Sequence, residues 1–399
     1  MKIGIFTDQY YPNISGVVTS INILAAGLRD LNHEVYIFTS YDDKLLDEDQ
    51  RKNLAQKNVV NLPGRAYPFK KLKDYRYSIK RGKILKTIKG YNLDVIHVQT
   101  DFNISKIAIS ASKKFNIPVV HTLHTLYEDY LGYVSPFFDR HFHNLMFNFL
   151  GNLFIKPISK ISVIDIVPTK KVLKLAPRYK MHGDIRVIPT GIDLSRFDSK
   201  LYSKQMILDL KSNLGIDDDK FVFAYIGRTS AEKSIEKIIN AFSDLKNSEN
   251  CVLLIVGGGP QLEELKELAS QSEKSKQIIF TGFIPSVDIP RYYQVADVFV
   301  NASISETQGL TYVEALASSL PILVQKDDCL EDVVEDYYNG IYFDGVEDLT
   351  VKMDEVQKVK STLKTIKSNT KKSVQKYSQE QYVKNIEAIY KEAIEKFKK

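Results

Sequence analysis

Residues 221–260 read FVFAYIGRTSAEKSIEKIINAFSDLKNSENCVLLIVGGGP, and they contain the repeating unit that decides the fold. An apolar strand, Phe221–Ile226, ends at Gly227, and the pattern then becomes that of a helix, Glu232–Leu245. A second apolar strand, Cys251–Val256, ends in three glycines. Strands that are separated by a helix of this length are typical of a parallel sheet covered on both faces.

The same alternation fills the first half of the chain, where a helical pattern over Val17–Leu31 follows the first strand. With 399 residues the chain is long enough for more than one domain. We expect an α/β protein with two Rossmann-like doubly wound domains, 1–190 and 191–375, facing a central cleft, and a C-terminal helix, 376–399, packing back on the first domain. The other expected strands are Ile3–Thr7, Val35–Thr39, Val59–Leu62, Asp94–Val98, Pro118–His121, Ile161–Val167, Arg186–Ile188, Ile278–Thr281, Val298–Asn301 and Ile322–Val324.

The composition favours a globular protein of a reducing compartment. Hydrophobic residues make up 44% and charged residues 26% of the chain, which argues against disorder. Two cysteines, Cys251 and Cys329, are too few for a disulfide framework or a zinc site. Asp8 interrupts the first apolar run too early for a signal peptide. No apolar run reaches the about 18 residues that are needed to span a bilayer.

The strongest chemical motif is residues 303–314, SISETQGLTYVE, which follow a strand and open a helix. Glu306 is expected in the loop at the strand end, and Glu314 about one turn inside the helix. A helix N-terminus offers unpaired amides to an anion, and a carboxylate beside them can accept hydrogen bonds from sugar hydroxyls. Alternatively, the helix dipole simply favours two glutamates there. The amides expected at the anion site belong to Gln308, Gly309 and Leu310.

A second motif, residues 227–233, also ends a strand and opens a helix. The guanidinium of Arg228 is planar and can donate two parallel hydrogen bonds, and the ammonium of Lys233 is a compact positive charge. Together the two cations are suited to binding one diphosphate. The alternative is that Arg228 and Lys233 are ordinary surface cations that bind no ligand. That alternative is disfavoured because cations near a helix start oppose the dipole unless an anion is present.

The first domain contributes weaker signals. Gly16, before the first helix, permits close approach of a phosphate, although an ordinary turn glycine explains it equally well. His121 and His124 end a strand, where a histidine can hold a hydroxyl group or polarise a reacting group, or simply be satisfied locally. The run Asp217–Asp219 matches a metal-binding D-x-D but is interpreted as a solvated turn, so no metal ion is expected.

The positive charge of the chain is concentrated in one segment. Residues 64–90 hold ten Lys or Arg and one acidic residue, a net charge of +9, while the whole chain carries +6. Interleaved aromatic and aliphatic residues are typical of an anchor on an anionic membrane surface. The alternatives are a solvated helix face and a nucleic-acid contact, but no nucleic-acid module is recognisable. The expected membrane-binding residues are Lys70, Lys71, Lys73, Arg76, Lys80, Arg81, Lys83 and Lys86.

The ordered set of motifs resembles the retaining GT-B glycosyltransferases, a family that includes sucrose synthases and bacterial lipid mannosyltransferases. The resemblance covers nearly the whole chain. It implies that Arg228 and Lys233 grip the donor diphosphate, that Glu306 contacts the sugar and that Glu314 contacts the ribose. It also implies that His124 lines the sugar site. The loop expected to hold the base contains Phe283 and Ile284.

The residues within the motifs are similar to those of the bacterial 1,2-diacylglycerol 3-alpha-glucosyltransferases, which form monoglucosyldiacylglycerol from UDP-glucose. The similar segments are residues 14–20, ISGVVTS, residues 124–130, HTLYEDY, and residues 306–312, ETQGLTY. Ser234 and Ser319 stand where the family has glycine. The resemblance implies UDP-glucose, diacylglycerol and anionic lipids as partners, no cofactor, no nucleic acid, and a peripheral place on the cytoplasmic face of the membrane.

Three other functions stay open from the sequence. One is the same transfer to another lipid or to a soluble sugar. A sugar-nucleotide epimerase would use the same fold and consume the UDP-sugar without an acceptor. A charge-driven binding protein would need neither Glu306 nor Arg228, and the ordered motif set argues against these last two functions.

Overall fold

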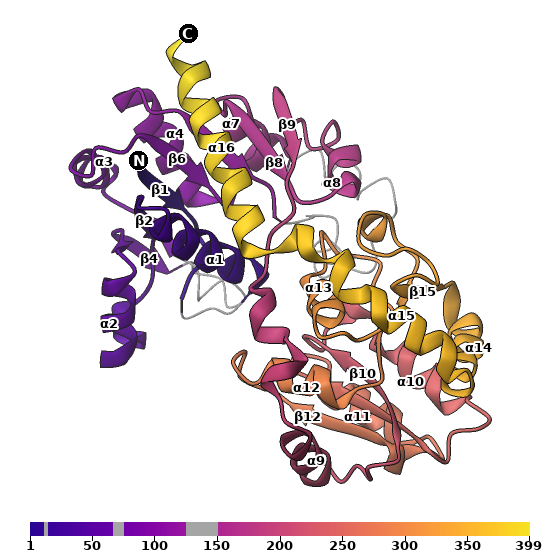
Figure 1. The fold of residues 1–399 in the computed structure, drawn as a ribbon. Helices are drawn as coiled ribbons and strands as arrows, with labels where there is room; N and C mark the ends of the chain where they lie inside the picture. The colour runs from indigo at the N-terminus through magenta and orange to yellow at the C-terminus, as the bar shows by residue number, and fades with distance from the viewer. Residues whose placement is uncertain (12–14, 67–75, 125–150) are drawn as a thin grey trace. The chain divides into compact units, whose positions relative to one another are not determined.

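The structure, a computed structural model, describes residues 1–11, 15–66, 76–124 and 151–399. The chain forms two compact units. The N-terminal domain comprises Met1–Gly191 together with Gln379–Lys399, and the C-terminal domain comprises Ile192–Ser378. The expected boundaries after residues 190 and 375 therefore lie one and three residues before the observed ones. Figure 1 shows the last helix within the N-terminal unit, where it lies beside the first helix.

The N-terminal domain is built on a seven-stranded parallel sheet in the order β3-β2-β1-β6-β7-β8-β9. The order reverses between β1 and β6, and in such sheets ligands bind outside the carboxyl ends of the strands at this point. A separate antiparallel pair, β4 (Gly64–Ala66) and β5 (Arg76–Ser78), was not predicted. The strands of the main sheet are β1 (Lys2–Phe6), β2 (Glu34–Thr39), β3 (Val59–Asn61), β6 (Val95–Val98), β7 (Val119–Thr122), β8 (Ile164–Val167) and β9 (Asp184–Val187).

Helices cover both faces of this sheet. Neighbouring residues of a strand point to opposite faces, so Ile3 and Ile5 pack with α1 and α16 while Phe6 packs with α3 and α4. Gly27 of α1 lies so close to α16 that an added Cβ would come within 2.5 Å of Val383. The helices are α1 (Gly16–Asp30), α2 (Glu48–Gln56), α3 (Arg81–Lys89), α4 (Asn103–Phe115), α7 (Lys156–Ser159), α8 (Lys170–Leu175) and α16 (Gln379–Lys398), with short turns η1 (Asp43–Leu45) and η3 (Gly151–Ile155).

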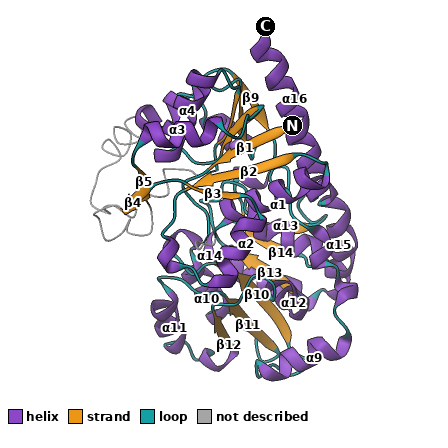
Figure 2. Cartoon of the chain, turned by 90° about the vertical axis from the view of Figure 1, so that its left-hand side faces the viewer, coloured by secondary structure: helices purple, strands orange, loops and turns teal. Residues whose placement is uncertain are grey.

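The C-terminal domain repeats this plan with a six-stranded parallel sheet in the order β12-β11-β10-β13-β14-β15. The strands β10, β11 and β12 lie side by side in Figure 2. The order reverses between β10 and β13. The strands are β10 (Phe221–Ile226), β11 (Cys251–Val256), β12 (Ile278–Gly282), β13 (Val298–Asn301), β14 (Ile322–Gln325) and β15 (Gly340–Phe343). The predicted α/β class with two doubly wound sheets is confirmed.

Helices again pack on both faces of the second sheet, in two apolar clusters. The predicted helix 232–245 is interrupted: Ala231–Lys233 forms a short turn, and α10 begins at Ile235 because Ser234 is left-handed, with φ 50°. The helices are α9 (Lys204–Asn213), α10 (Ile235–Ser243), α11 (Leu262–Ser270), α12 (Ile289–Val295), α13 (Leu310–Ala317), α14 (Gly345–Lys358) and α15 (Lys360–Ser373). The short turns are η4 (Leu194–Phe197), η5 (Ser199–Leu201), η6 (Ala231–Lys233), η7 (Ser275–Gln277), η8 (Asp328–Leu330) and η9 (Gln375–Tyr377).

Candidate donor site

Two glycine-containing loops pack backbone to backbone at the carboxyl ends of β10 and β11. A Cβ on Gly257, whose φ is 131°, would stand 1.9 Å from the carbonyl oxygen of Gly227. A Cβ on Gly259 would stand 2.3 Å from the carbonyl oxygen of Thr229, and the Thr229 amide donates to Gly258 at 3.1 Å. The glycine run is therefore required to position the loop that carries Arg228.

The two predicted phosphate-binding cations already have carboxylate partners. Arg228 Nη2 donates to Glu232 Oε1 at 2.6 Å, and the Arg228 side chain is 60% exposed. Lys233 Nζ donates to Glu306 Oε1 at 2.6 Å, and these two side chains are only 19% and 14% exposed. The argument that such cations require an external anion is wrong, because Glu232 and Glu306 supply the negative charge. Sequence reasoning missed Glu232, although it lies inside the motif.

The motif around Glu306 is tied to the motif around Lys233 by further contacts. The hydroxyl groups of Ser303 and Ser305 donate to the carbonyl oxygen of Glu232 at 3.1 and 3.0 Å. Two predicted motifs that are about 70 residues apart therefore form one structure within the C-terminal domain. A side-chain hydroxyl of Thr229, fully buried beside them, has no hydrogen-bond partner among the described residues.

The predicted anion-binding turn opens α13. Gly309 is the N-cap residue with φ 69°, and no side chain caps the helix. A Cβ on Gly309 would collide with the Tyr312 ring at 2.2 Å, so glycine is needed here both for conformation and for space. Gln308 is buried, while Leu310 packs against the apolar core. The Tyr312 amide donates to the carbonyl oxygen of Gly309 at 3.1 Å, and the end of the helix without a side-chain cap is the kind of place that suits an anion.

Glu314 lies in the second turn of α13 and is held by a residue that sequence reasoning missed. The Tyr293 hydroxyl donates to Glu314 Oε2 at 2.9 Å. Burial raises the pKa of Glu314, and the hydrogen bond from Tyr293 opposes that rise. Tyr293 is 1% exposed, in α12. The adjacent Tyr292 has the same residue type, so nothing local in the sequence distinguishes the partner of Glu314.

The predicted base-binding loop follows β12. Phe283 is 68% exposed, while Ile284 packs against the core. The carbonyl oxygen of Gly282 accepts a hydrogen bond from the Gly257 amide at 3.1 Å, which joins this loop to the glycine run. An exposed aromatic ring that is anchored in this way offers a flat face for stacking.

The remaining predicted site residues belong to the N-terminal domain. Gly16 is the first residue of α1, and no described atom lies within 4 Å of the place where its Cβ would stand. His121 is fully buried and its nitrogens are 2.5 Å from Asp101 Oδ1 and 2.9 Å from Asp165 Oδ1. It is therefore an internal ion-pair residue. His124 follows the same strand and is only partly buried, so it can meet a ligand.

The basic segment differs from a membrane anchor in one respect. Ile84, Leu85 and Ile88 of α3 are buried in the core, so these three of the interleaved aliphatic residues do not belong to an exposed apolar face. Arg76 is engaged with Asp42 at 2.8 Å. Lys70, Lys71 and Lys73 lie outside the described residues. The exposed cations of the described part are Arg65, Lys80, Arg81, Lys83, Lys86 and Lys89, and four of these, Lys80, Arg81, Lys83 and Lys86, belong to the predicted membrane-binding set.

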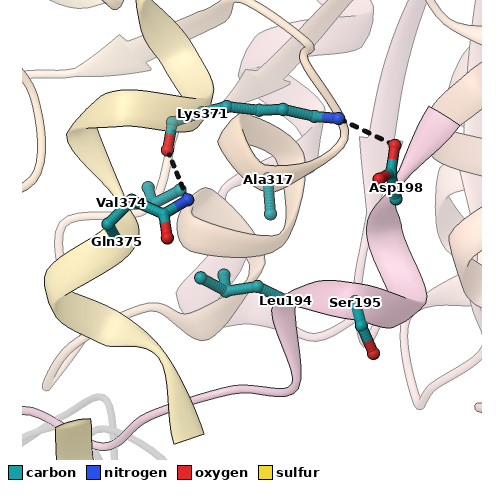
Figure 3. A pocket seen from close by; sticks show the side chains of 7 residues that line it. All are labelled: Leu194, Ser195, Asp198, Ala317, Lys371, Val374 and Gln375. Carbon is teal, nitrogen blue, oxygen red and sulfur yellow. Dashed lines mark hydrogen bonds and ion pairs between the residues drawn. The ribbon is translucent and has the colours of Figure 1, made fainter. Parts of the chain in front are cut away.

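Two cavities lie away from the predicted site. The first, of about 210 Å³, contains the ion pair between Lys371 and Asp198 at 2.9 Å (Figure 3). It is lined by Leu194, Ser195, Asp198, Ala317, Lys371, Val374 and Gln375. The second, of about 300 Å³, is lined by Tyr10, Tyr11, Asn22, Asp47, Asp49, Gln50, Asn53, Leu54 and Lys57. None of the predicted donor-site residues lines either cavity.

Within residues 1–11, 15–66, 76–124 and 151–399, no helix combines the length and the apolar character that crossing a bilayer requires. In the same part of the chain, no group of three or more His, Cys, Asp or Glu side chains is arranged to hold a metal ion. The run Asp217–Asp219 is exposed, in the turn before β10.

The fold is shared with solved glycosyltransferases. A structure of Anabaena HepE in complex with UDP-glucose matches with a TM-score of 0.76 and 19% identity, over 98% of this chain and 100% of that one. A sucrose-phosphate synthase from Thermosynechococcus elongatus also matches with a TM-score of 0.76 and 19% identity, over 98% of each chain. These likenesses establish the fold.

Sequence comparisons establish the family. Residues 14–196 match the model of Glycosyltransferase Family 4, and residues 207–373 match that of Glycosyl transferases group 1. The alpha-monoglucosyldiacylglycerol synthase of Acholeplasma laidlawii is 39% identical over 99% of this chain and 98% of its own. The enzyme of the same name from Streptococcus pneumoniae is 36% identical over 88% of this chain and 76% of its own. The chain therefore belongs to the alpha-monoglucosyldiacylglycerol synthase family of GT-B glycosyltransferases.

Proposed function

We propose that this glycosyltransferase moves glucose from UDP-glucose to 1,2-diacylglycerol and forms alpha-monoglucosyldiacylglycerol. The observation that carries the proposal is the 39% identity with the Acholeplasma laidlawii relative, which extends over nearly the whole of both chains. The donor-site residues predicted by resemblance also gather in the C-terminal domain, which supports a nucleotide-sugar site there. The proposed place of reaction is the cytoplasmic face of the membrane.

The first task of the donor site is to stabilise the departing diphosphate. Arg228, Lys233 and the first amides of α13 provide positive charge at the place where negative charge would develop. In the absence of donor, Glu232 and Glu306 neutralise the two cations. A diphosphate brings more negative charge than one carboxylate, so it would compete for both. Glu306, once released from Lys233, is free to accept hydrogen bonds from the sugar.

The proposed stereochemical course is retention. The acceptor hydroxyl would attack the sugar on the face from which UDP departs, the bond to the diphosphate would break as the new bond forms, and the hydroxyl proton would pass to the departing phosphate oxygen. His124 and Glu306 act as positioning groups in this scheme, and Glu314 holds the ribose. The scheme uses no metal ion, so a chelator is expected to leave turnover unchanged.

Attachment to the membrane is proposed to be electrostatic. The described part of the basic segment exposes cations on α3 and turns its aliphatic residues inward. Anionic headgroups attract each such cation by about 1 kcal/mol before screening. Diacylglycerol is confined to the bilayer, so attachment would bring the enzyme to its acceptor.

The test is a transfer assay with purified protein, UDP-glucose and vesicles containing diacylglycerol, with and without anionic phospholipid. Alpha-glucosyldiacylglycerol is the expected product, and more of it with anionic lipid. Arg228→Ala should lower kcat on the order of 10²–10³-fold, as expected for loss of one preorganised contact to developing charge. Lys266→Ala removes an exposed cation of the same domain and should leave kcat unchanged.

The other outcomes identify the rival functions. Release of UDP without any glycolipid would retain the donor and reject diacylglycerol as acceptor. Conversion of the UDP-sugar to another UDP-sugar would indicate an epimerase. Normal turnover of a folded Arg228→Ala variant would refute the role of the cation.

A further inference from the structure

His124 lies just after β7, and its ring is held from the side of the protein core. Its Nε2 is hydrogen-bonded to the side-chain oxygen of Gln99, which follows β6 and is 1% exposed. An amide oxygen accepts hydrogen bonds and cannot donate them, so a neutral His124 carries its proton on Nε2 in this contact. The other ring nitrogen, Nδ1, is then a hydrogen-bond acceptor.

Gln99 is itself fixed by a second histidine. Its side-chain nitrogen lies 3.0 Å from each ring nitrogen of His97, which is fully buried. The amide of Gln99 therefore turns its nitrogen toward His97 and its oxygen toward His124. Burial lowers the pKa of His97 well below its usual value and that of His124 to about 4, so both rings are neutral near pH 7.

Hydroxyl groups occupy both ring nitrogens of His97. The Tyr390 hydroxyl lies 2.7 Å from Nδ1, and the Thr122 hydroxyl lies 2.7 Å from Nε2. The rings of Tyr390 and His97 also meet edge to face, with centroids 5.4 Å apart. Tyr390 is fully buried and belongs to α16, so it reaches His97 across 293 positions of sequence.

We propose that Tyr390, His97 and Gln99 form a positioning chain that holds His124 in its Nε2–H form, with Nδ1 as the acceptor offered to the donor sugar. The consequence for the sugar rests on the proposed function, whereas the state of the His124 ring does not. In this view α16 has a part in the reaction: its tyrosine determines what His124 can recognise. A ring with Nδ1 as acceptor binds a sugar hydroxyl that donates.

The physical basis is the mutual dependence of buried polar groups. Tyr390, His97 and Gln99 are all excluded from water, so no solvent replaces a partner that is removed. Loss of the Tyr390 hydroxyl leaves His97 Nδ1 with the Gln99 amide alone. A proton on Nδ1 would then have only the Gln99 side chain as a partner, and a Gln99 side chain turned around would accept it with its oxygen. The oxygen of Gln99 is therefore no longer forced to face His124.

The same helix provides a matched control. Tyr382 is also a buried tyrosine of α16, and its hydroxyl lies 3.2 Å from that of Ser20, away from His97. Tyr382→Phe and Tyr390→Phe each remove one buried hydroxyl from α16, the first where it meets α1 and the second where it meets β6. A role of Tyr390 in packing alone would make the two variants equivalent.

The experiment records nitrogen chemical shifts of histidine-labelled full-length protein, with the His124 signals assigned by their loss in His124→Gln. The wild-type protein and Tyr382→Phe should show the Nε2–H form of His124. Tyr390→Phe and Gln99→Met should show a mixture of the two tautomers. In the transfer assay, Tyr390→Phe should lower kcat/KM for UDP-glucose about fivefold through a higher KM, the usual effect of one lost hydrogen bond. Tyr382→Phe should keep the wild-type value.

Persistence of the pure Nε2–H form in both Tyr390→Phe and Gln99→Met would overturn the positioning chain. Equal kinetic losses in Tyr390→Phe and Tyr382→Phe would reduce Tyr390 to a packing residue. If Tyr390→Phe does not fold, the tautomer of His124 in Gln99→Met decides. A tautomer shift in a protein that transfers no glucose would retain the chain and reject the proposed function.

Discussion

At the scale of single residues, the two serines that replace family glycines stand in left-handed backbone. Ser234 has φ 50° and Ser319 has φ 60°. Ser319 follows the cap of α13, where its amide donates to Leu316 at 3.1 Å and the next amide donates to Ala315 at 3.0 Å. These bonds form the usual glycine-terminated helix end. The substitutions therefore add backbone strain without removing the hydrogen bonds of the motif.

Ser319→Gly is expected to stabilise the C-terminal domain. Relief of a left-handed side chain contributes about 1–2 kcal/mol, and the greater freedom of glycine in the unfolded chain offsets about 0.4–1 kcal/mol of it. A net gain of about 1 kcal/mol would raise Tm by roughly 2–4 °C, which calorimetry can measure. Ser318→Gly is the control. Ser318 has φ −75°, and its hydroxyl donates to the backbone carbonyl oxygen of Glu314 at 2.9 Å, so this substitution should lower Tm. An unchanged or lower Tm for Ser319→Gly would argue against strain.

At the scale of elements, His121 joins three separate segments at the carboxyl edge of the first sheet. It lies in β7, while Asp165 lies in β8 and Asp101 precedes α4. Burial lowers the pKa of His121, but the two carboxylates outweigh burial and raise it to about 10. A protonated His121 between two aspartates therefore fixes the strand ends from which the loop of His124 departs.

The stability contributed by His121 should depend on pH in a defined direction. The pKa is about 10 in the folded protein and about 6.5 in the unfolded chain, so folding takes up a proton between these values. The contribution is complete below pH 6.5 and is lost as the pH rises toward 10. His121→Gln should lower the free energy of unfolding by about 3–5 kcal/mol at pH 6.5, because it removes the cation that two buried carboxylates share. Denaturant unfolding should show the gap between wild type and variant closing by pH 10; a constant gap would mean that His121 is uncharged.

At the scale of the whole molecule, the distribution of charge matters more than the net value. The cations of α3, Arg81, Lys83, Lys86 and Lys89, are exposed, while the aliphatic residues of the same helix belong to the core. In the proposed attachment, this surface would attract anionic headgroups through its positive charge. Binding should therefore weaken steeply with salt, since the screening length falls to about 3 Å at 1 M.

Replacing two of these cations tests the surface. Lys83→Gln with Lys86→Gln should weaken binding to anionic vesicles roughly 30-fold, at about 1 kcal/mol for each cation. Lys246→Gln with Lys276→Gln, two exposed lysines of the C-terminal domain, should change vesicle binding little. Co-sedimentation at several salt concentrations measures both pairs. Equal losses in the two pairs would show that net charge, and not α3, drives binding.

Much of the fold was predictable because its signals are local. Short apolar runs separated by helical patterns predicted all strands of the two parallel sheets except β15, a short strand without a distinct pattern. The antiparallel pair β4 and β5 was missed for the same reason. The break before α10 was not predicted, because Ser234 is not the residue that usually marks a left-handed position. Glycine would have marked it.

The α/β class, the two-domain plan and the family were predictable from the sequence alone, because each depends on local patterns and on the order of the motifs. Only the tertiary structure decided which groups hold one another. It paired Lys233 with Glu306, Glu314 with Tyr293, and His97 with Tyr390. It also turned the aliphatic residues of α3 inward. Partners that meet across tens or hundreds of residues leave no periodic trace in the chain, because burial and hydrogen bonding depend on what folding brings together.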